Sequence, residues 1–198
     1  MTTFYFIRHG EVENPQQVWY GRLSGYALSV VGRQQAHQAA NYFSSKDIDA
    51  IYSSPLLRTE QTAEIIAKRL DTVLNYSDDL LEINSVMQGK KYSDLAAINY
   101  NIFASETNNI EAESIVSAAR RIKNFLLEIS QKNQVVIAVS HGDILMLLKL
   151  MHKSLELNNF NLRQQAGEYT HHCEVYKVLF ENGEIKSLTS VFRPSVLK

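Results

Sequence analysis

The chain has little of what characterises secreted, linker-rich or membrane-spanning proteins. Its 198 residues include one cysteine, Cys173, three prolines and eight glycines. A lone cysteine excludes an internal disulfide and a cysteine-based metal cluster, and so few prolines and glycines leave little room for a linker. No apolar run approaches the roughly 20 residues that span a bilayer. With no recognisable signal peptide, we expect a single domain over residues 1–198 in a reducing, cytoplasmic setting.

An excess of charge of either sign is also missing. Lys and Arg together number 20 and Asp and Glu number 21, so the formal net charge is -1. Such a chain has no broad field that attracts nucleic acid or an anionic membrane. We therefore expect neither as a partner, and recognition of an anion would need a local cluster of cations. The sequence leaves the oligomeric state open.

Short apolar segments alternate with amphipathic ones along the chain. Strands are expected at residues 4–7, 50–53, 73–76 and 135–139, and helices at about 29–43, 58–70, 113–130 and 143–152. This alternation predicts an α/β fold with a mostly parallel central sheet and helices on both faces, a three-layer α/β/α arrangement. Segments 173–180 and 185–191 flank Asn182-Gly183, which favours a tight hairpin and so adds one late antiparallel strand.

The stretch from Asp78 to Asn109 interrupts the alternation. It is irregular, and it carries Gly89, Lys90 and several asparagines. We expect an insertion over residues 78–109 that contains short helices and lies over the site like a lid. Its depth would then decide which substrates gain access.

Two of the apolar strands end on a histidine followed by a glycine. The first runs into Arg8-His9-Gly10, and a later one runs into Ser140-His141-Gly142. Sites in α/β sheets form at the carboxyl ends of strands, so we expect one shared site. A neighbouring arginine disfavours protonation of an imidazole, and a neutral ring nitrogen is a nucleophile. Because arginine suits phosphate oxygens, the pair indicates attack on phosphorus, although each histidine alone could be a satisfied core residue.

A third segment places Arg58 just after a strand, in the first turn of a helix. Backbone donors and the helix dipole favour an anion at that position. An arginine is electrostatically better placed at the other end of a helix, so its location here needs a reason. Binding of an anion would supply one, and the alternative is a surface arginine.

Together these segments resemble the histidine phosphatase superfamily, also called phosphoglycerate mutase-like. The matching motifs occur in order: Arg8-His9-Gly10-Glu11, Leu28-Ser29-x-x-Gly32-Arg33-x-Gln35-Ala36, Ser53-Ser54-Pro55-Leu56-x-Arg58-Thr59-x-Gln61-Thr62-Ala63, Leu81-Glu82-Ile83-Asn84 and Ser140-His141-Gly142. Each motif alone is weak, but five in order across roughly residues 1–150 are very specific. The segment after Leu150 resembles the family only in its strand pattern.

The resemblance implies a fold and a chemistry. His9 would attack the phosphoryl group and carry it as a transient phosphohistidine, while Arg8, Arg58 and His141 would hold the phosphoryl oxygens. Glu82 would protonate the leaving oxygen, and neither a metal nor another cofactor would be needed. We therefore expect a metal-independent phosphatase that acts on a small metabolite, a phosphosugar or protein phosphohistidine.

Three other residues are expected to contact the substrate. Gly142 begins the helix that follows the second histidine. Asn14 lies five residues after His9, where mutases of the family commonly have an asparagine six residues after the nucleophile. Arg22 lies in the loop of residues 12–28, where contact with the substrate and packing under the loop are equally open.

Two features have structural interpretations. Glu11 is expected to fix a neighbouring group through a hydrogen bond. His171 and His172 are adjacent, and adjacent side chains on a strand point to opposite faces. We therefore expect no metal site there, and one of the two rings at the rim of the site.

Two other functions remain as alternatives. A phosphoglycerate mutase would move phosphoryl groups between hydroxyls, but mutase relatives usually have longer chains, so 198 residues favour hydrolysis. A non-catalytic phosphate- or phosphoprotein-binding module would use the same cations without turnover. It ranks last because every member of the expected catalytic set is present.

Overall fold

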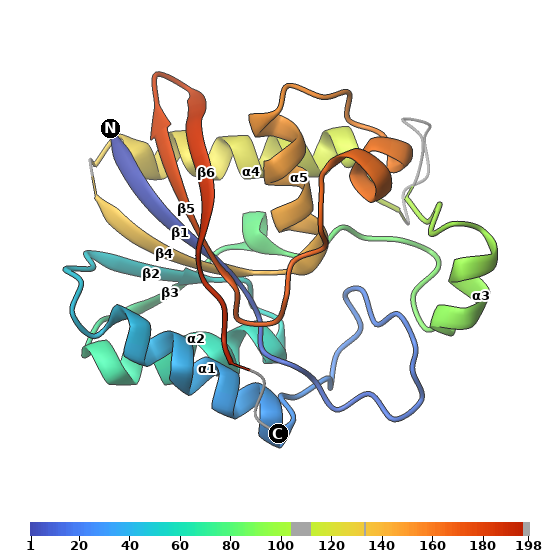
Figure 1. Ribbon diagram of the computed structural model, residues 1–198, viewed down its shortest axis with the longest axis horizontal. Helices are drawn as coiled ribbons and strands as arrows, with labels where there is room; N and C mark the ends of the chain where they lie inside the picture. Colours follow the sequence, from blue (N-terminus) through green and yellow to red (C-terminus); the bar gives the residue numbers. More distant parts are fainter. Residues whose placement is uncertain (104–111, 133, 196–198) are drawn as a thin grey trace.

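The computed structural model describes residues 1–103, 112–132 and 134–195. Its six-stranded sheet has the order β3-β2-β4-β1-β5-β6 (Figure 1). The parallel strands are β1 (Thr2–Arg8), β2 (Ala50–Ser53), β3 (Leu74–Tyr76) and β4 (Val135–Ser140). The late hairpin consists of β5 (Val175–Glu181), which is antiparallel to β1, and β6 (Glu184–Phe192), which is antiparallel to β5. The expected mostly parallel sheet with a late antiparallel element is confirmed.

Helices cover both faces of this sheet. Figure 1 shows α1 (Val30–Phe43) and α2 (Leu57–Leu70) on one side, and α4 (Ile115–Ser130) and α5 (Gly142–His152) on the other. Shorter elements are the 3₁₀ turn η1 (Asp78–Leu80), the helix α3 (Tyr92–Ala97) and the π-helical turn η2 (Asn161–Gln165). The three-layer α/β/α arrangement is therefore also confirmed.

Strand β1 supplies apolar side chains to both layers. Phe4 and Phe6 belong to the core that includes residues of α4 and α5, whereas Tyr5 and Ile7 belong to the core that includes residues of α1 and α2. Successive side chains of a strand point to opposite faces. A strand covered on both faces therefore needs a continuous apolar run, which is the pattern that the sequence shows.

The late hairpin differs from expectation at its start. The strand expected from Cys173 begins at Val175, because Cys173 lies in a turn and has a φ of 52°. The loop between the two strands is as expected, since Asn182 and Gly183 have φ of 52° and 78°. Two consecutive positive φ angles are what a tight type I′ hairpin turn requires.

The stretch from Asp78 to Asn109 contains η1 and α3 in its described part. The rest of it, residues 104–109, lies outside the described residues. The helices of the described part of the chain are too short or too polar to cross a bilayer.

Candidate active site

The carboxyl ends of three neighbouring strands meet at one edge of the sheet. Arg8 at the end of β1 pairs with Ser140 at the end of β4, and Val139 pairs with Ser53 at the end of β2. The residues that follow these ends therefore emerge side by side: His9, His141 and Ser54. This register brings the two histidine-bearing turns together, and the ring centroids of the two histidines lie 5.4 Å apart.

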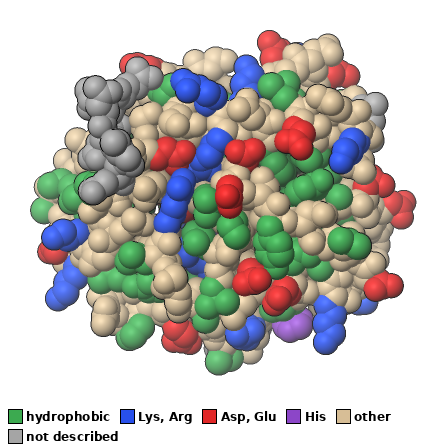
Figure 2. Space-filling view, turned by 180° about the vertical axis from the view of Figure 1, so that it is seen from behind, with side chains coloured by type: hydrophobic (Ala, Val, Ile, Leu, Met, Phe, Trp, Pro, Cys, Tyr) green, Lys and Arg blue, Asp and Glu red, His purple; other side chains and the backbone are tan. Residues whose placement is uncertain are grey.

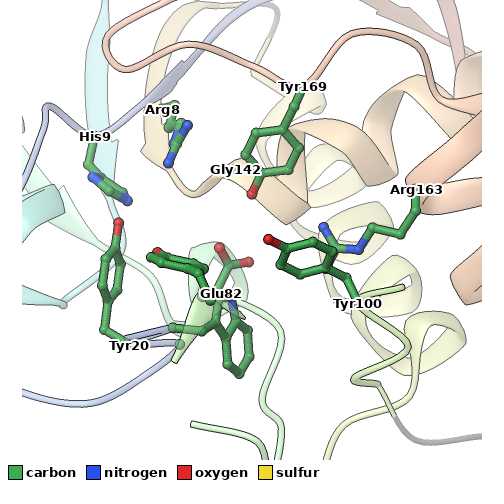
Figure 3. A pocket seen from close by; sticks show the side chains of 11 residues that line it. Arg8, His9, Tyr20, Glu82, Tyr100, Gly142, Arg163 and Tyr169 are labelled. Carbon is green, nitrogen blue, oxygen red and sulfur yellow. The ribbon is translucent and has the colours of Figure 1, made fainter. Parts of the chain in front are cut away.

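His9 is buried, and its ring points into a pocket (Figure 3). Its Nδ1 lies 2.7 Å from the carbonyl oxygen of Gly10. A carbonyl oxygen only accepts hydrogen bonds, so Nδ1 carries the proton. Burial and the positive charges of Arg58 and Arg8 hold the pKa of His9 well below its usual value. The ring is therefore neutral with a lone pair on Nε2, the form that a nucleophile requires.

The turn after β1 is fixed by groups from α1 and α2. The backbone N–H of Gly10 donates to Thr62 Oγ1 at 3.1 Å, and the Ser29 hydroxyl donates to the Glu11 carboxylate at 2.8 Å. The backbones also approach so closely that a Cβ on Gly32 would collide with the carbonyl oxygen of Glu11. Only glycine fits such an approach. Glu11 thus has the structural hydrogen bond that was expected of it.

Arg58 lies in the first turn of α2, buried against His141. Its Nη2 donates to the carbonyl oxygen of Gly21 at 2.6 Å and lies 3.2 Å from Nδ1 of His141. A guanidinium only donates, so this Nδ1 accepts. Burial and the charge of Arg58 hold the pKa of His141 well below its usual value. The Nε2–H of the neutral ring then donates to Ser54 Oγ at 2.8 Å.

His141 consequently differs from its expected role in one respect. It lies beside His9 as expected, but both of its ring nitrogens are engaged, one by Arg58 and the other by Ser54. In this arrangement the ring orients the guanidinium of Arg58. It presents no free N–H to a phosphoryl oxygen.

Arg8 and Arg58 are cations without a counterion in the described part of the chain. None of the salt bridges found there involves either residue. The Nε of each guanidinium is also buried without a hydrogen-bond partner among the described residues. Buried charges and buried donors in proteins are normally paired. Two such arginines beside one neutral imidazole are the arrangement that binding of an anion requires.

Glu82 lies on the opposite wall of the pocket from Arg8 (Figure 3). Its carboxylate accepts the backbone N–H of Ile83 at 3.0 Å. Burial and the nearby charge of Asp143 raise the pKa of Glu82 to about 7. A carboxyl group that titrates near neutrality can both give and take a proton at the pH of catalysis.

Four of the six residues expected to contact the substrate do not line this pocket: Arg58, His141, Arg22 and Asn14. Arg22 donates through Nε to the carbonyl oxygen of Glu82 at 2.6 Å and through Nη2 to the Glu113 carboxylate at 2.8 Å. The side-chain amide of Asn14 bonds both backbone groups of Val18, at 2.8 and 3.2 Å. In this structure, therefore, Arg22 fixes the segment that contains Glu82, and Asn14 fixes the loop to which it belongs.

The pocket has a volume of about 410 Å³. Of the residues expected at the site, it is lined by Arg8, His9, Glu82 and Gly142. Trp19, Tyr20 and Gly21, from the loop of residues 12–28, also line it. The sequence analysis did not single out four further lining residues: Tyr92, Tyr100, Arg163 and Tyr169. The first two belong to the described part of the insertion, which therefore reaches the pocket; none of the four belongs to a motif that would have marked it.

His171 and His172 have different surroundings, as expected. His172 lies at the rim, with its ring centroid 5.7 Å from that of His9, and burial together with the charge of Arg8 lowers the pKa of His172 to about 3. His171 is exposed and lies 3.0 Å from the Glu168 carboxylate. Across the described residues, no group of three or more His, Cys, Asp or Glu side chains is arranged to hold a metal ion.

Parts of this sequence are similar to those of other proteins. Phosphoserine phosphatase 1 of Hydrogenobacter thermophilus is 33% identical over 151 residues, which cover 71% of each chain. An uncharacterized protein of Mycobacterium tuberculosis is 40% identical over 90 residues. That match covers 46% of this chain and 45% of the relative, so the chain matches less than half of that relative's length.

Solved structures and a family model extend the comparison to nearly the whole chain. YhfR of Bacillus stearothermophilus superposes with a TM-score of 0.80 at 22% identity, over 93% of this chain and 94% of the other. A mycobacterial glucosyl-3-phosphoglycerate phosphatase superposes with a TM-score of 0.74 at 22% identity, over 89% of each chain. These two share the fold. Because the model of the histidine phosphatase superfamily (branch 1) matches residues 4–191, the chain belongs to that superfamily.

Proposed function

We propose that this protein is a metal-independent phosphatase that hydrolyses phosphomonoesters through a phosphohistidine on His9. The observation that carries the proposal is that one pocket is lined by three different groups: the neutral imidazole of His9, the guanidinium of Arg8, and the carboxyl group of Glu82, whose pKa is about 7. Among the described residues, Arg8 has no carboxylate partner. Two of the proteins named above are phosphatases, one named for phosphoserine and the other for glucosyl-3-phosphoglycerate. Their names support the reaction and leave the substrate open among small metabolites, phosphosugars and protein phosphohistidine.

In the first step, Nε2 of His9 attacks phosphorus and the bond from phosphorus to the leaving oxygen breaks. Glu82 gives its proton to that oxygen. The guanidinium groups of Arg8 and Arg58 bind the phosphoryl oxygens, on which charge is spread in the transition state. The backbone N–H of Gly142, at the positive end of α5, adds a further donor.

In the second step, water attacks the phosphorus of the phosphohistidine. The nitrogen–phosphorus bond breaks, and the proton of the water passes to the Glu82 carboxylate. Inorganic phosphate leaves, His9 is again neutral with a free Nε2, and Glu82 is again protonated. The same carboxyl group thus serves as acid and then as base, which a pKa near 7 permits.

The first test is release of inorganic phosphate from a panel of phosphomonoesters in the presence of a chelator. We expect turnover without added metal. The same assay with 3-phosphoglycerate and a trace of 2,3-bisphosphoglycerate distinguishes the mutase alternative. Rapid isomerisation with little free phosphate would contradict the proposal, as would phosphate binding without turnover of any ester.

Substitution of Glu82 tests the acid. Glu82→Gln should lower kcat/KM for alkyl phosphates by about 10²–10⁴-fold, and much less for p-nitrophenyl phosphate, whose leaving group needs little protonation. The acid form predominates below a pH of about 7. Wild-type kcat/KM for an alkyl phosphate should therefore fall as the pH rises through that value, and the variant should lose this part of the profile.

An exposed glutamate on α4 provides the matched control. Glu128→Gln should leave both the rate and its pH dependence unchanged, because this side chain lies away from the pocket. Equal losses on alkyl and aryl phosphates in Glu82→Gln would show that Glu82 does not protonate the leaving group.

A further inference from the structure

The two ends of the pocket differ in how their cations are compensated. Figure 3 shows His9 and Arg8 at one end and Arg163 at the opposite end. Arg8 has no carboxylate partner among the described residues. Arg163 has one, because its Nη1 and Nη2 lie 2.7 and 3.3 Å from the two carboxylate oxygens of Asp143. One end therefore attracts an anion, and the other is already neutral.

The ion pair at the second end is held by its surroundings. Asp143 is fully buried in the first turn of α5 and also accepts the hydroxyl of Tyr169 at 3.2 Å. The guanidinium of Arg163 lies 5.8 and 5.3 Å from the ring centroids of Tyr100 and Phe103. A two-pronged arginine–carboxylate pair is strong and geometrically fixed. A substrate carboxylate would therefore have to compete with Asp143 for this cation.

Arg163 still offers N–H donors that Asp143 does not use. Its Nε is buried without a hydrogen-bond partner among the described residues. An N–H group beside a charge that is already neutralised suits an uncharged oxygen, such as that of a hydroxyl group. A hydroxyl group adds no negative charge that Asp143 or Glu82 would repel. A carboxylate at the same place would meet both of these acidic groups.

Aromatic side chains line the pocket between its ends. Trp19, Tyr92 and Tyr100 all contribute to its wall, and Trp19 is itself packed edge-on against Phe103, with ring centroids 6.0 Å apart. Aromatic walls with a few fixed polar groups bury the faces of ring-shaped ligands. The wall therefore fits a ring better than a short open chain.

We propose that the leaving group of the substrate is an uncharged, hydroxyl-bearing ring, and that the Asp143–Arg163 pair selects against esters whose leaving group carries a carboxylate. The inference rests on the proposed phosphatase function and names its substrate class, a phosphorylated sugar. It also distinguishes this chain from its relative named for phosphoserine, which carries a carboxylate.

The test compares substrates that differ in whether the leaving group carries a carboxylate. Glycerol 3-phosphate and 3-phosphoglycerate are nearly isosteric, and only the second has a carboxylate. In the wild type, kcat/KM should favour the neutral ester by about 10–100-fold, the cost of an ionic group left without its partner. Ribose 5-phosphate and glucose 6-phosphate should exceed glycerol 3-phosphate, because they add the ring.

Variants of the ion pair should move this selectivity in opposite directions. Asp143→Asn frees the cation and should lower the ratio of neutral to carboxylated ester by at least about tenfold. Arg163→Met leaves the carboxylate of Asp143 alone and should keep the ratio high or raise it. The ratio is taken within one enzyme, so a general loss of activity cancels. Asp94→Asn, an exposed change on α3, is the matched control and should leave the ratio unchanged.

Measurements of ligand binding test the same preference in variants whose turnover is too slow to assay. Calorimetric binding of the two esters to His9→Ala protein, with and without Asp143→Asn, should show the same preference and the same reversal. Equal use of the two esters by the wild type, an unchanged ratio in Asp143→Asn, or no gain from a ring would overturn the inference while the phosphatase stands. Failure to release phosphate from any ester would instead overturn the proposed function.

Discussion

His9→Ala should abolish turnover, with phosphate release reduced by at least about 10⁴-fold. The reason is geometric as well as chemical. The hydrogen bond from Nδ1 to the carbonyl oxygen of Gly10 leaves Nε2 as the unprotonated nitrogen of a neutral ring. No alanine side chain can attack phosphorus, so the covalent route is lost. Steady-state phosphate release from an alkyl phosphate and from p-nitrophenyl phosphate measures the effect.

The intermediate provides a second measurement of the same prediction. Rapid quenching of the wild-type enzyme with radiolabelled substrate should trap a phosphoenzyme that is labile in acid and stable in alkali. The label should be absent from His9→Ala and retained in His37→Ala, an exposed histidine on α1. An acid-stable label would indicate a serine or threonine nucleophile and would contradict the role assigned to His9.

Arg58→Ala should lower kcat/KM by about 10²–10³-fold, the loss typical of removing one donor from a preorganised transition-state site. Arg58 holds Gly21 and His141 through Nη2, and its Nε has no hydrogen-bond partner among the described residues, so we expect Nε to bind the phosphoryl group. Lysine cannot make these contacts together, because its single ammonium group lacks the planar fork. Arg58→Lys should therefore recover little of the lost activity. Arg69→Ala, an exposed change near the end of the same helix, is the control and should retain the wild-type rate.

Thermal unfolding separates binding of the anion from catalysis. A ligand that binds only the folded state raises the melting temperature, and the stabilisation grows with the logarithm of its concentration once this exceeds Kd. Inorganic phosphate should therefore stabilise the wild type, because it supplies a counterion that Arg8 and Arg58 do not have within the described part of the chain. Arg58→Ala should show little of this stabilisation. An unchanged shift with phosphate, or a near-normal kcat, would remove Arg58 from the site.

Some of the site was predictable because its signals are local. A buried strand that ends in Arg8-His9 must turn where its apolar run stops, and a helix that begins near Arg58 must present free N–H groups. The order of motifs along the chain then identified Glu82, whose sequence surroundings alone would indicate only a solvated loop carboxylate. Its burial and its pKa of about 7 come from side chains far away in the sequence.

Other residues show what a linear pattern does not contain. Arg22 was expected near the substrate, yet its guanidinium bonds the backbone of Glu82 and the carboxylate of Glu113. His141 was expected to hold a phosphoryl oxygen, yet its nitrogens bond Arg58 and Ser54. In both cases the side chain lies in the expected region. The partner that captures it is set by long-range packing.

By itself, then, the sequence determined the layers of the fold, the strand ends that carry the two histidines, and the family. These follow from hydrophobic periodicity and from short motifs, which act over a few residues. Only the tertiary structure decided that β4 lies between β1 and β2, which sets His141 between His9 and Ser54. It likewise decided that Arg163, in a π-helical turn without a motif, neutralises Asp143 at the far end of the pocket. Strand order and ion pairing depend on which surfaces from distant parts of the sequence pack against one another. The free energy of that packing comes from the whole chain, not from a few neighbouring residues.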